Sequence, residues 1–516
     1  MYYNRVIKLL ASIFMIFPAV CCAAGNYHKG DSILELMFER KSPLGSSLRS
    51  YYAAGAATLH FIDSISVSDA AVSADLERFD RPVIAQCGSG NNDYKVSARS
   101  YYKLSPSSTI SGHAAYVNGS TDNIKFCNVV DYETFAPFVV GDDAGGDLSR
   151  QQYSFGGAWG QRYESWSIGV SADYLAENAH RAVDPRVKNT VSDLNVMLGG
   201  ARMVGSRYML GVNVGFKTYH LDSDVAFYNP TEHAVSYVFT GLGGTANRFK
   251  GADAQAASHR VTGFSAALQF VPAEHSNSYY AAVEASTVKA DLILRGYRDL
   301  NYGSTVTNKV GFSLSRLIVI RRNLSLFPTV SGSLVGRVAT ENLFGSSDEN
   351  YVTIGSRKNY HHNRLCVAAG LPASLSLPSR TTVSVDLKAA YMADEEYLTE
   401  PSRKLKTDFM QLSATLGATQ RFSGHWTIGA NAGINARNIL STSALWGGLD
   451  LTSPVGQATL DNYQMASCNA SSLSAGLLLS RAIKSVAVTL SVEYRHTDYR
   501  RLNVGDHIIS YISLVF

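Results

Sequence analysis

The sequence lacks long apolar runs and is poor in charge. Charged residues are 17% of its 516 residues, below the roughly one quarter that is usual for soluble domains. After residue 24 no apolar stretch approaches the about 20 residues that a membrane-spanning helix requires. The net charge is only +4 and no basic tract is present, so nucleic acid is not expected as a partner. A helical membrane protein and a nucleic-acid-binding protein are both disfavoured.

Cysteine is also scarce, with six residues in the chain. Cys366 and Cys468 fall in expected strands without the spacing of metal ligands. Cys87 and Cys127 fall in polar segments that are expected to form neighbouring outer loops. Either a disulfide joins them, which an exported protein permits, or both are free thiols. No metal and no cofactor is predicted.

The first 24 residues have the pattern of a secretory signal peptide. Arg5 and Lys8 precede an apolar core from Leu9 to Val20, and small residues follow at Ala23 and Ala24. We therefore expect a signal peptide over 1–24, a short periplasmic segment over 25–50 and a barrel over 51–516. A short helix is expected from Asp31 to Lys41, in a segment too small for a plug domain.

What the chain does have is period-two alternation, repeated many times. In residues 485–496, Val488, Leu490 and Val492 share one face, while Thr489 and Glu493 share the other. Residues 165–174, 382–391 and 426–435 alternate in the same way. Tyr or Trp tends to end the apolar face and the polar face is rich in small residues, as a lipid-facing barrel with a wet lumen requires.

The connections between these segments alternate in length. Short ones are expected near 104–106, 162–164, 204–206, 271–276, 321–323, 376–380, 421–425 and 481–484. Long polar ones are expected near 67–91, 119–149, 177–189, 221–257, 294–303, 339–357, 395–405, 438–465 and 497–505. Outer-membrane barrels have short periplasmic turns and long extracellular loops. With an opening strand near 52–66, the pattern predicts an all-β, antiparallel transmembrane barrel of about 18 strands, with 16 as the alternative.

The last segment, His507 to Phe516, is amphipathic and ends in an aromatic residue. We interpret Phe516 as the barrel-closing end, of the kind that resembles the signal read by the barrel assembly machinery. That machinery and outer-membrane lipid are the expected partners, and a surface lipoprotein or uptake receptor is a further candidate.

Two segments resemble an uncharacterised outer-membrane barrel family of Bacteroidetes-type bacteria. The first is Pro137–Asp147, followed by Tyr153 and Gly156-Gly157, and the second is His180–Asn189, after Tyr174. The resemblance implies a barrel fold and an outer-membrane location, and it implies no particular chemistry.

Charged side chains on the polar faces of the strands must point into the lumen, because a Lys or Arg facing lipid near the midplane costs about 2–4 kcal/mol. These lumen candidates are Asp173, Lys217, Glu284, Asp386, Lys388, Glu493 and Arg495. They either line a pore or pair across a filled interior. Both signs are present, so no strong ion selectivity is predicted.

Two loop clusters are further candidates. Asp142, Asp143 and Asp147 either bind a divalent cation or are simply solvated. Arg181, Asp184 and Arg186 either contact an anionic substrate at the pore mouth or form a salt-bridged loop that folds into the barrel, which we favour.

The size of the barrel favours passage of small solutes, since 16 to 18 strands can enclose an aqueous channel. We predict a porin-like channel or a nutrient-uptake component. One alternative is a non-conducting scaffold or accessory subunit whose long loops, such as 221–257 and 438–465, plug the lumen. A barrel protease or phospholipase is the third alternative. The histidines His361, His362 and His507 lack a supporting Ser/His arrangement, so we expect no enzyme and no catalytic residue.

Overall fold

The computed structural model describes residues 30–228, 235–250, 256–273, 277–346, 351–422, 425–500 and 502–516. The predicted signal peptide, residues 1–24, lies outside the described residues. Within the described ranges, no helix combines the length and the apolar character needed to cross a membrane.

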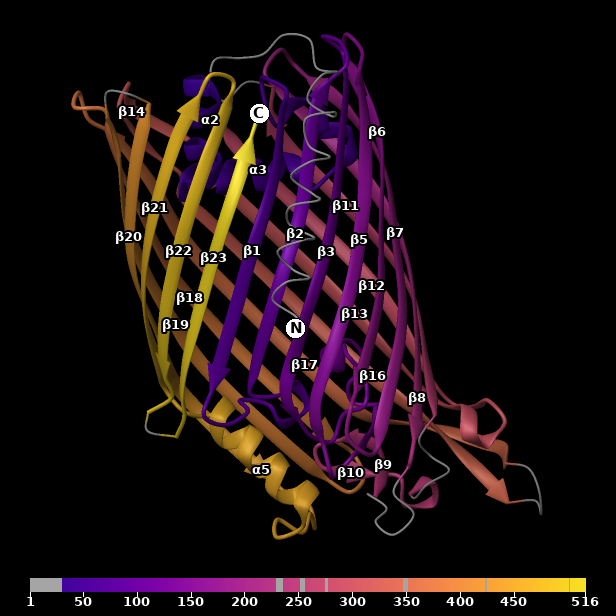
Figure 1. The fold of residues 1–516 in the computed structure, drawn as a ribbon. Coiled ribbons are helices and arrows are strands. Elements are labelled where there is room, and N and C mark those ends of the chain that lie inside the picture. Colours follow the sequence, from indigo (N-terminus) through magenta and orange to yellow (C-terminus); the bar gives the residue numbers. More distant parts are fainter. Residues whose placement is uncertain are drawn as a thin grey trace.

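Among the described residues, eighteen strands form one closed antiparallel barrel (Figure 1). They are β1 (Val67–Phe79), β2 (Gly90–Lys103), β3 (Ser108–Ile124), β5 (Gly146–Arg162), β6 (Trp166–Arg181), β7 (Arg186–Val204), β8 (Tyr208–Ala226), β11 (Ala257–Pro272), β12 (Tyr279–Leu294), β13 (Leu300–Arg316), β16 (Thr329–Ser346), β17 (Tyr351–Ser376), β18 (Thr381–Leu398), β19 (Arg403–Arg421), β20 (Trp426–Leu445), β21 (Ala470–Ile483), β22 (Val486–Asp498) and β23 (Val504–Val515). Each pairs with its neighbours along the chain, and β1 pairs with β23 to close the barrel. The predicted fold class and the count of about 18 strands are confirmed.

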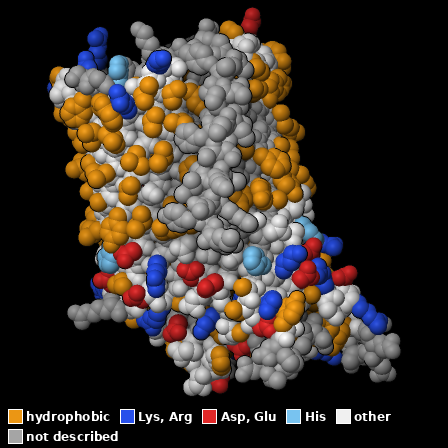
Figure 2. Space-filling view, in the orientation of Figure 1, with side chains coloured by type: hydrophobic (Ala, Val, Ile, Leu, Met, Phe, Trp, Pro, Cys, Tyr) orange, Lys and Arg blue, Asp and Glu red, His pale blue; other side chains and the backbone are white. Residues whose placement is uncertain are grey.

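The alternation seen in the sequence separates the two faces of the wall. On β13, Val310, Phe312 and Leu314 are each at least half exposed on the outside, while Lys309 and Ser313 between them line an internal cavity. Figure 2 shows hydrophobic side chains covering the barrel wall, with Asp, Glu, Lys and Arg gathered at the lower end. An apolar belt bounded by charge is the exterior that a membrane-spanning barrel requires.

The two ends of the barrel differ as the spacing predicts. At one end, which we call the short-turn end, hairpins such as β2–β3, β5–β6 and β18–β17 are joined by three to four residues. The β13–β16 connection adds a small hairpin of β14 (Ile318–Arg321) and β15 (Leu324–Leu326). The other end, the long-loop end, carries segments 125–145, 227–256 and 446–469. Several other outer loops are shorter than expected, because the strands continue beyond the apolar belt and leave only 182–185, 295–299 and 399–402 between them.

The start of the barrel differs from the prediction. The expected opening strand near 52–66 is not a strand; residues Ala56–Phe61 form the 3₁₀ helix η2, and the first strand is β1, in a region expected to be loop. The reason lies in β1, whose lumen-facing side carries Asp69, Asp75 and Glu77 and therefore has the composition of a loop.

The segment before β1 lies inside the barrel at the short-turn end (Figure 1). It comprises α2 (Gly30–Lys41), α3 (Pro43–Ala53) and η2, which together we call the lumen plug. Ser42 caps α3 by accepting a hydrogen bond from the Gly45 amide at 3.0 Å, and Pro43 occupies the first turn. Leu48, Tyr51 and Tyr52 are buried against the inner wall. The expected short periplasmic segment is therefore, over its described part, a plug seated in the lumen.

Glycine on the inner wall makes room for η2. Gly160, Gly169 and Gly199 occupy adjacent strands β5, β6 and β7 and all face the plug. A Cβ on Gly169 would lie 2.2 Å from the carbonyl oxygen of Ala56, closer than any side chain allows. Ser167 on the same strand donates a hydrogen bond to the Ala57 carbonyl at 2.8 Å. The plug backbone thus contacts the wall directly.

The long-loop end is also filled. Residues 125–145 turn inward with α4 (Tyr132–Phe135) and β4 (Val140–Asp142), and β4 pairs with β9 (Ser236–Gly241) from the next long loop. We call 125–145 the inward loop. β10 (Gly244–Thr245) and the 3₁₀ turns η3 (Ala85–Cys87), η4 (Asn247–Phe249) and η6 (Arg295–Tyr297) lie in the surrounding loops, and α5 (Pro454–Ala466) covers this end (Figure 1). Phe126, Phe135 and Val139 pack with lumen-facing Leu221 and Val261 of the wall in one buried cluster.

Candidate functional site

Between the lumen plug and the filled long-loop end lies a cavity of about 810 Å³, which we call the chamber. Its floor is α3, through Ser47, Ser50 and Tyr51, and its wall is formed by strands β7 to β19. The volume is in the range of about 300–1,000 Å³ that small-molecule sites occupy. The chamber is therefore the candidate functional site.

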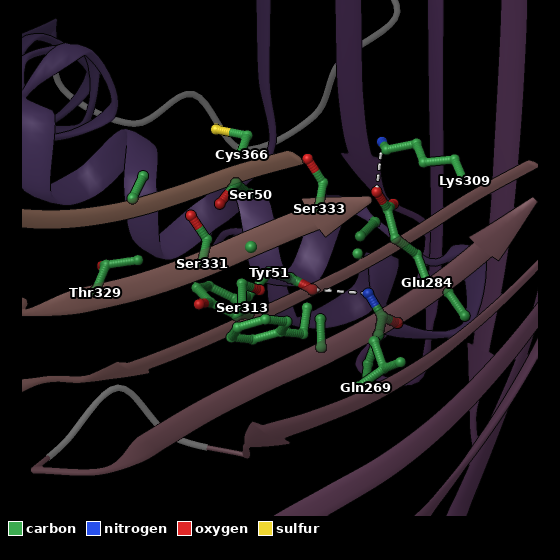
Figure 3. A pocket seen from close by; sticks show the side chains of 18 of the residues that line it. Ser50, Tyr51, Gln269, Glu284, Lys309, Ser313, Thr329, Ser331, Ser333 and Cys366 are labelled. Carbon is green, nitrogen blue, oxygen red and sulfur yellow. Dashed lines mark hydrogen bonds and ion pairs between the residues drawn. The ribbon is translucent and has the colours of Figure 1, made fainter. Parts of the chain in front are cut away.

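Hydroxyl groups dominate one side of the chamber (Figure 3). Successive lumen-facing positions of β16 bring Thr329, Ser331 and Ser333 into one row, because every second residue of a strand faces the same way. Cys366 of β17 lies beside this row, and Ser313 of β13 lies across from it. A row of hydroxyls offers both donors and acceptors to a polar guest.

The floor of the chamber is tied to the wall by hydrogen bonds. Gln269 donates its side-chain amide to the Tyr51 carbonyl at 2.9 Å, and its own carbonyl accepts from Asn213 at 2.8 Å. The Tyr51 hydroxyl is 2.7 Å from the Ser315 hydroxyl. These hydrogen bonds thus fix the position of α3 relative to the inner wall of the barrel.

Charge inside the chamber is paired. The Lys309 ammonium lies 2.6 Å from Glu284, and the Lys388 ammonium lies 2.7 Å from Asp386 (Figure 3 shows the first pair). Each pair joins neighbouring positions of the wall rather than opposite sides of the lumen. The described lining residues bring no set of metal ligands together. Because its charges are paired, the lining carries little net charge.

The other lumen candidates are paired in the same manner. Asp173 lies 3.6 Å from His113, Lys217 lies 2.9 Å from Asp193, and Arg495 lies 3.4 Å from Glu493. Two of these pairs lie on one strand or between adjacent strands, and His113 and Asp173 meet across Gly156 of the strand between them. Of the two alternatives, pairing across the interior is not found for these described residues.

The two loop clusters of the sequence meet at one buried ion pair. Arg181, at the end of β6, lies 2.5 Å from Asp142 of the inward loop, and their side chains are 3% and 0% exposed. Arg181 also donates to the Pro185 carbonyl at 2.7 Å. Asp142 accepts a further hydrogen bond from the Gly145 amide. Arg181 and Asp142 therefore anchor the inward loop in the lumen.

The remaining acids of these clusters bind the backbone. Asp143 accepts a hydrogen bond from the Val235 amide, and Asp147 accepts one from the Asn123 amide. Asp184 lies 3.2 Å from Arg186 and accepts from the Tyr228 amide. The three acids of the Asp142, Asp143, Asp147 cluster thus have separate protein partners, and they do not converge on one cation position.

Cys87 and Cys127 are free thiols, which is the alternative to the disulfide. Cys127 is buried in the inward loop and points to the Val129 carbonyl, whereas Cys87 is exposed in η3. Burial raises the pKa of the Cys127 thiol to about 12. Phe516 exchanges two backbone hydrogen bonds with Ser68 of β1, at 2.8 and 2.9 Å, at the seam of the barrel.

A second buried ionic group lies at the short-turn end, within the segment before β1. Arg40 of α2 and Arg49 of α3 both pair with Asp63, whose side chain is 3% exposed. Burial lowers the pKa of Arg49 despite this carboxylate. One carboxylate facing two guanidinium groups thus ties α2 and α3 to the linker between η2 and β1, within the segment before the barrel.

Several of these residues escaped the sequence analysis. Lys309 alternates with Val310 and Phe312 and could have been found from the same period-two pattern. The hydroxyl row on β16 and the floor residues Ser50 and Tyr51 carry no such signal, because serine is common on every lumen-facing strand and the plug was not expected.

Comparison with known proteins gives a family and a set of distant structures. A family model described as "Family of unknown function (DUF6850)" matches residues 56–510, in line with the expected resemblance to an uncharacterised family. No curated protein has a matching sequence.

Among solved structures, a mutant of the ferric enterobactin receptor PfeA from Pseudomonas aeruginosa is 7% identical, over 88% of this chain and 81% of that chain, with a TM-score of 0.37. The ferric-catecholate import receptor Fiu from E. coli K12 is 6% identical over 88% and 82%, with a TM-score of 0.38. The CymD monoaromatic hydrocarbon channel is 12% identical over 90% and 92%, with a TM-score of 0.31. At these values the similarities carry no inference about function.

Proposed function

This chain belongs to the family of unknown function DUF6850, and from its own geometry we propose that it is a gated uptake barrel for a small, polar solute without net charge. The single observation that carries the proposal is the chamber, a cavity of about 810 Å³ lined by hydroxyls and paired charges. It lies in the lumen of a barrel with an apolar belt, and the lumen is where a polar solute would cross the membrane.

The proposal places the barrel in the outer membrane of a Gram-negative bacterium, and the motif resemblance implies the Bacteroidetes type. Short turns then face the periplasm and long loops face outward. The chain would act as a transporter and not as an enzyme. Barrel assembly machinery and outer-membrane lipid are its proposed partners, and a surface lipoprotein or uptake receptor would present the solute at the long-loop end.

Gating is part of the proposal because chain fills the lumen on both sides of the chamber. On the short-turn side the plug is seated on three glycines. The inward loop continues into barrel strands at both of its ends, β3 and β5, whereas the described plug continues into one, β1. The plug is therefore the proposed gate.

Locking and releasing the plug tests this proposal. In Leu59→Cys/Gly160→Cys the two Cβ atoms would start 3.2 Å apart, close to the about 3.5–4.5 Å of a disulfide. Gly169→Val cannot accommodate η2, because its Cβ would meet the Ala56 carbonyl. Gly200→Val on β7 is the matched control, since a Cβ there has nothing within 4 Å.

In liposome swelling with neutral sugars, we expect Gly169→Val to increase flux at least tenfold over the wild type, and Gly200→Val to leave it unchanged. The oxidised double-cysteine protein should show no flux, and reduction should restore the wild-type value. Gly199→Val, whose Cβ would lie 2.9 Å from the Ala57 amide nitrogen, provides a second release variant if Gly169→Val does not fold, as judged by the heat-dependent shift of the barrel on gels.

The filled ends also favour a second candidate, a non-conducting scaffold or accessory subunit of a secretion or uptake complex. It predicts no flux from the wild type or from either release variant, together with stable partners in membrane pull-downs. That combination would sink the uptake proposal. A protease or phospholipase activity of the refolded protein would instead favour an enzyme.

A further inference from the structure

Three side chains with metal-ligand chemistry converge on the lumen wall beyond the chamber. His362 lies on β17, and Asp394 and Glu396 lie on β18, where His362 and Glu396 are register partners. The His362 Nε2 atom is 2.8 Å from Asp394 Oδ1 and 4.0 Å from Glu396 Oε1. All three ligand atoms lie within 4.8 Å of one another. On β17, His362 is two lumen-facing positions from Cys366, on the side of the long-loop end.

The distances suit a small divalent cation. One imidazole nitrogen and two carboxylate oxygens are donors that zinc accepts at about 2.0–2.2 Å. Tetrahedral geometry at those bond lengths separates two donors by about 3.3 Å. The present separations from His362, 2.8 and 4.0 Å, bracket this value, so a cation requires His362 and Asp394 to move apart slightly and Glu396 to approach.

The second oxygen of each carboxylate is already held by another residue. Arg364 donates its Nε–H to Asp394 Oδ2 at 2.5 Å, and Tyr360 donates its hydroxyl to Glu396 Oε2 at 3.0 Å. Both carboxylates are thereby oriented with one free oxygen toward His362. Partners of this kind, which aim ligands without binding the metal, are typical of metal sites in proteins.

The cluster is also reachable from the lumen. The side chains of His362, Asp394 and Glu396 are 14%, 24% and 34% exposed, so a fourth ligand position faces open space. A simple ion pair needs one carboxylate, as in His113–Asp173 elsewhere on the wall. Two convergent carboxylates, each with its own supporting donor, distinguish this cluster from that pair.

We propose that His362, Asp394 and Glu396 form a binding site for a divalent transition-metal cation of the zinc class, with one coordination position open to the lumen. Arg364 and Tyr360 act as positioning residues. The site goes beyond the proposed uptake function and is independent of it, because binding can occur whether or not a solute passes through the barrel.

Calorimetric titration of the full chain in detergent, purified without a histidine tag and treated with EDTA, tests the site with ZnCl₂. We expect one Zn²⁺ per chain, and titration with CoCl₂ should give the visible absorption bands of low-symmetry Co²⁺. His362→Gln and Glu396→Gln should each weaken binding at least tenfold. Tyr360→Phe should weaken it by about tenfold, the lower end of what loss of a supporting hydrogen bond does.

His113→Gln is the matched control, because it removes a lumen histidine that faces one carboxylate only, and it should bind Zn²⁺ as the wild type does. The heat-dependent gel shift verifies that each variant is a folded barrel. If His362→Gln does not fold, the affinity of Glu396→Gln decides the test. Absence of stoichiometric binding by the wild type, or unchanged affinity in the folded cluster variants, overturns the site. Neither result bears on the flux of the plug variants.

Discussion

At the scale of single residues, the inward loop depends on one ion pair with no access to water. Arg181 and Asp142 are 3% and 0% exposed. Arg181 also donates to the Pro185 carbonyl in the turn after β6, and Asp142 accepts from the Gly145 amide within the inward loop. An ion pair of this kind adds little net stability when intact, because both charges lose their hydration. Its loss is expensive, because the remaining charge has no partner.

We therefore expect Asp142→Ala to lower the free energy of unfolding by about 3–5 kcal/mol, the usual effect of breaking a buried pair. Replacing both residues, as Asp142→Leu/Arg181→Met, should destabilise less than the single change. Glu493→Ala is the control, since its partner Arg495 is nearly half exposed, and it should cost no more than about 1 kcal/mol. Urea unfolding in phospholipid vesicles measures all three, and equal effects of Asp142→Ala and Glu493→Ala would contradict the anchoring role.

At the scale of elements, the sequence predicted the strands correctly wherever one face is apolar and the other is polar. β6, β18, β20 and β22 each alternate apolar and polar residues over the part that was predicted as strand, and each lies where the alternation predicts it, with ends that extend into the expected loops. β1 breaks the rule, because its outer face carries small residues such as Ala70 and its inner face carries acids. It pairs with β2, the next strand along the chain, and with β23, which lies more than 400 residues further on and which a local pattern does not contain.

The plug shows the opposite error, a segment that was predicted as a strand and is not one. Residues 52–66 are apolar enough to suggest a membrane strand, yet Ala57 and Leu59 are buried against the inside of the wall. What decides between the two is the glycine seat on β5, β6 and β7, about 100 residues further along the chain. The chamber was unpredictable for the same reason, because its floor is the plug.

The plug should also respond to pH through His60. Burial, together with the charges of Lys103 and Arg162, lowers the pKa of His60 to about 4, from the ordinary value of 6.5. Between these values the docked plug keeps His60 neutral, whereas a released plug takes up a proton. Docking therefore weakens as the pH falls from about 6.5 and stops weakening below about 4.

Hydrogen exchange of residues 56–61, corrected for the intrinsic pH dependence of exchange, measures this effect. We expect protection to decrease between pH 7 and pH 5 in the wild type. His60→Gln should show the same protection at both values, because no proton is exchanged. A decrease of equal size in the variant would assign the pH response to another group.

At the scale of the whole molecule, the lumen is a nearly neutral passage built from charged parts. Each lumen candidate named from the sequence has a partner on the same or the adjacent strand, except Asp173 of β6, whose partner His113 lies on β3, beyond Gly156 of β5. The chamber contains the Glu284–Lys309 pair. Paired charges cancel at the distance of a passing ion, so an opened barrel should not discriminate strongly by sign. Removing one member of a pair should therefore reveal the other.

Single-channel recording in planar bilayers, across a KCl gradient and in the Gly169→Val background, measures this directly. We expect a reversal potential close to zero for the released barrel. Glu284→Gln should shift it toward anion preference, because Lys309 loses its partner, and Lys309→Gln should shift it toward cation preference. The double variant should return to zero, which separates charge pairing from a change of pore shape. Unchanged reversal potentials in both single variants would show that the chamber does not lie on the conduction path, and shifts of the same sign would contradict charge pairing.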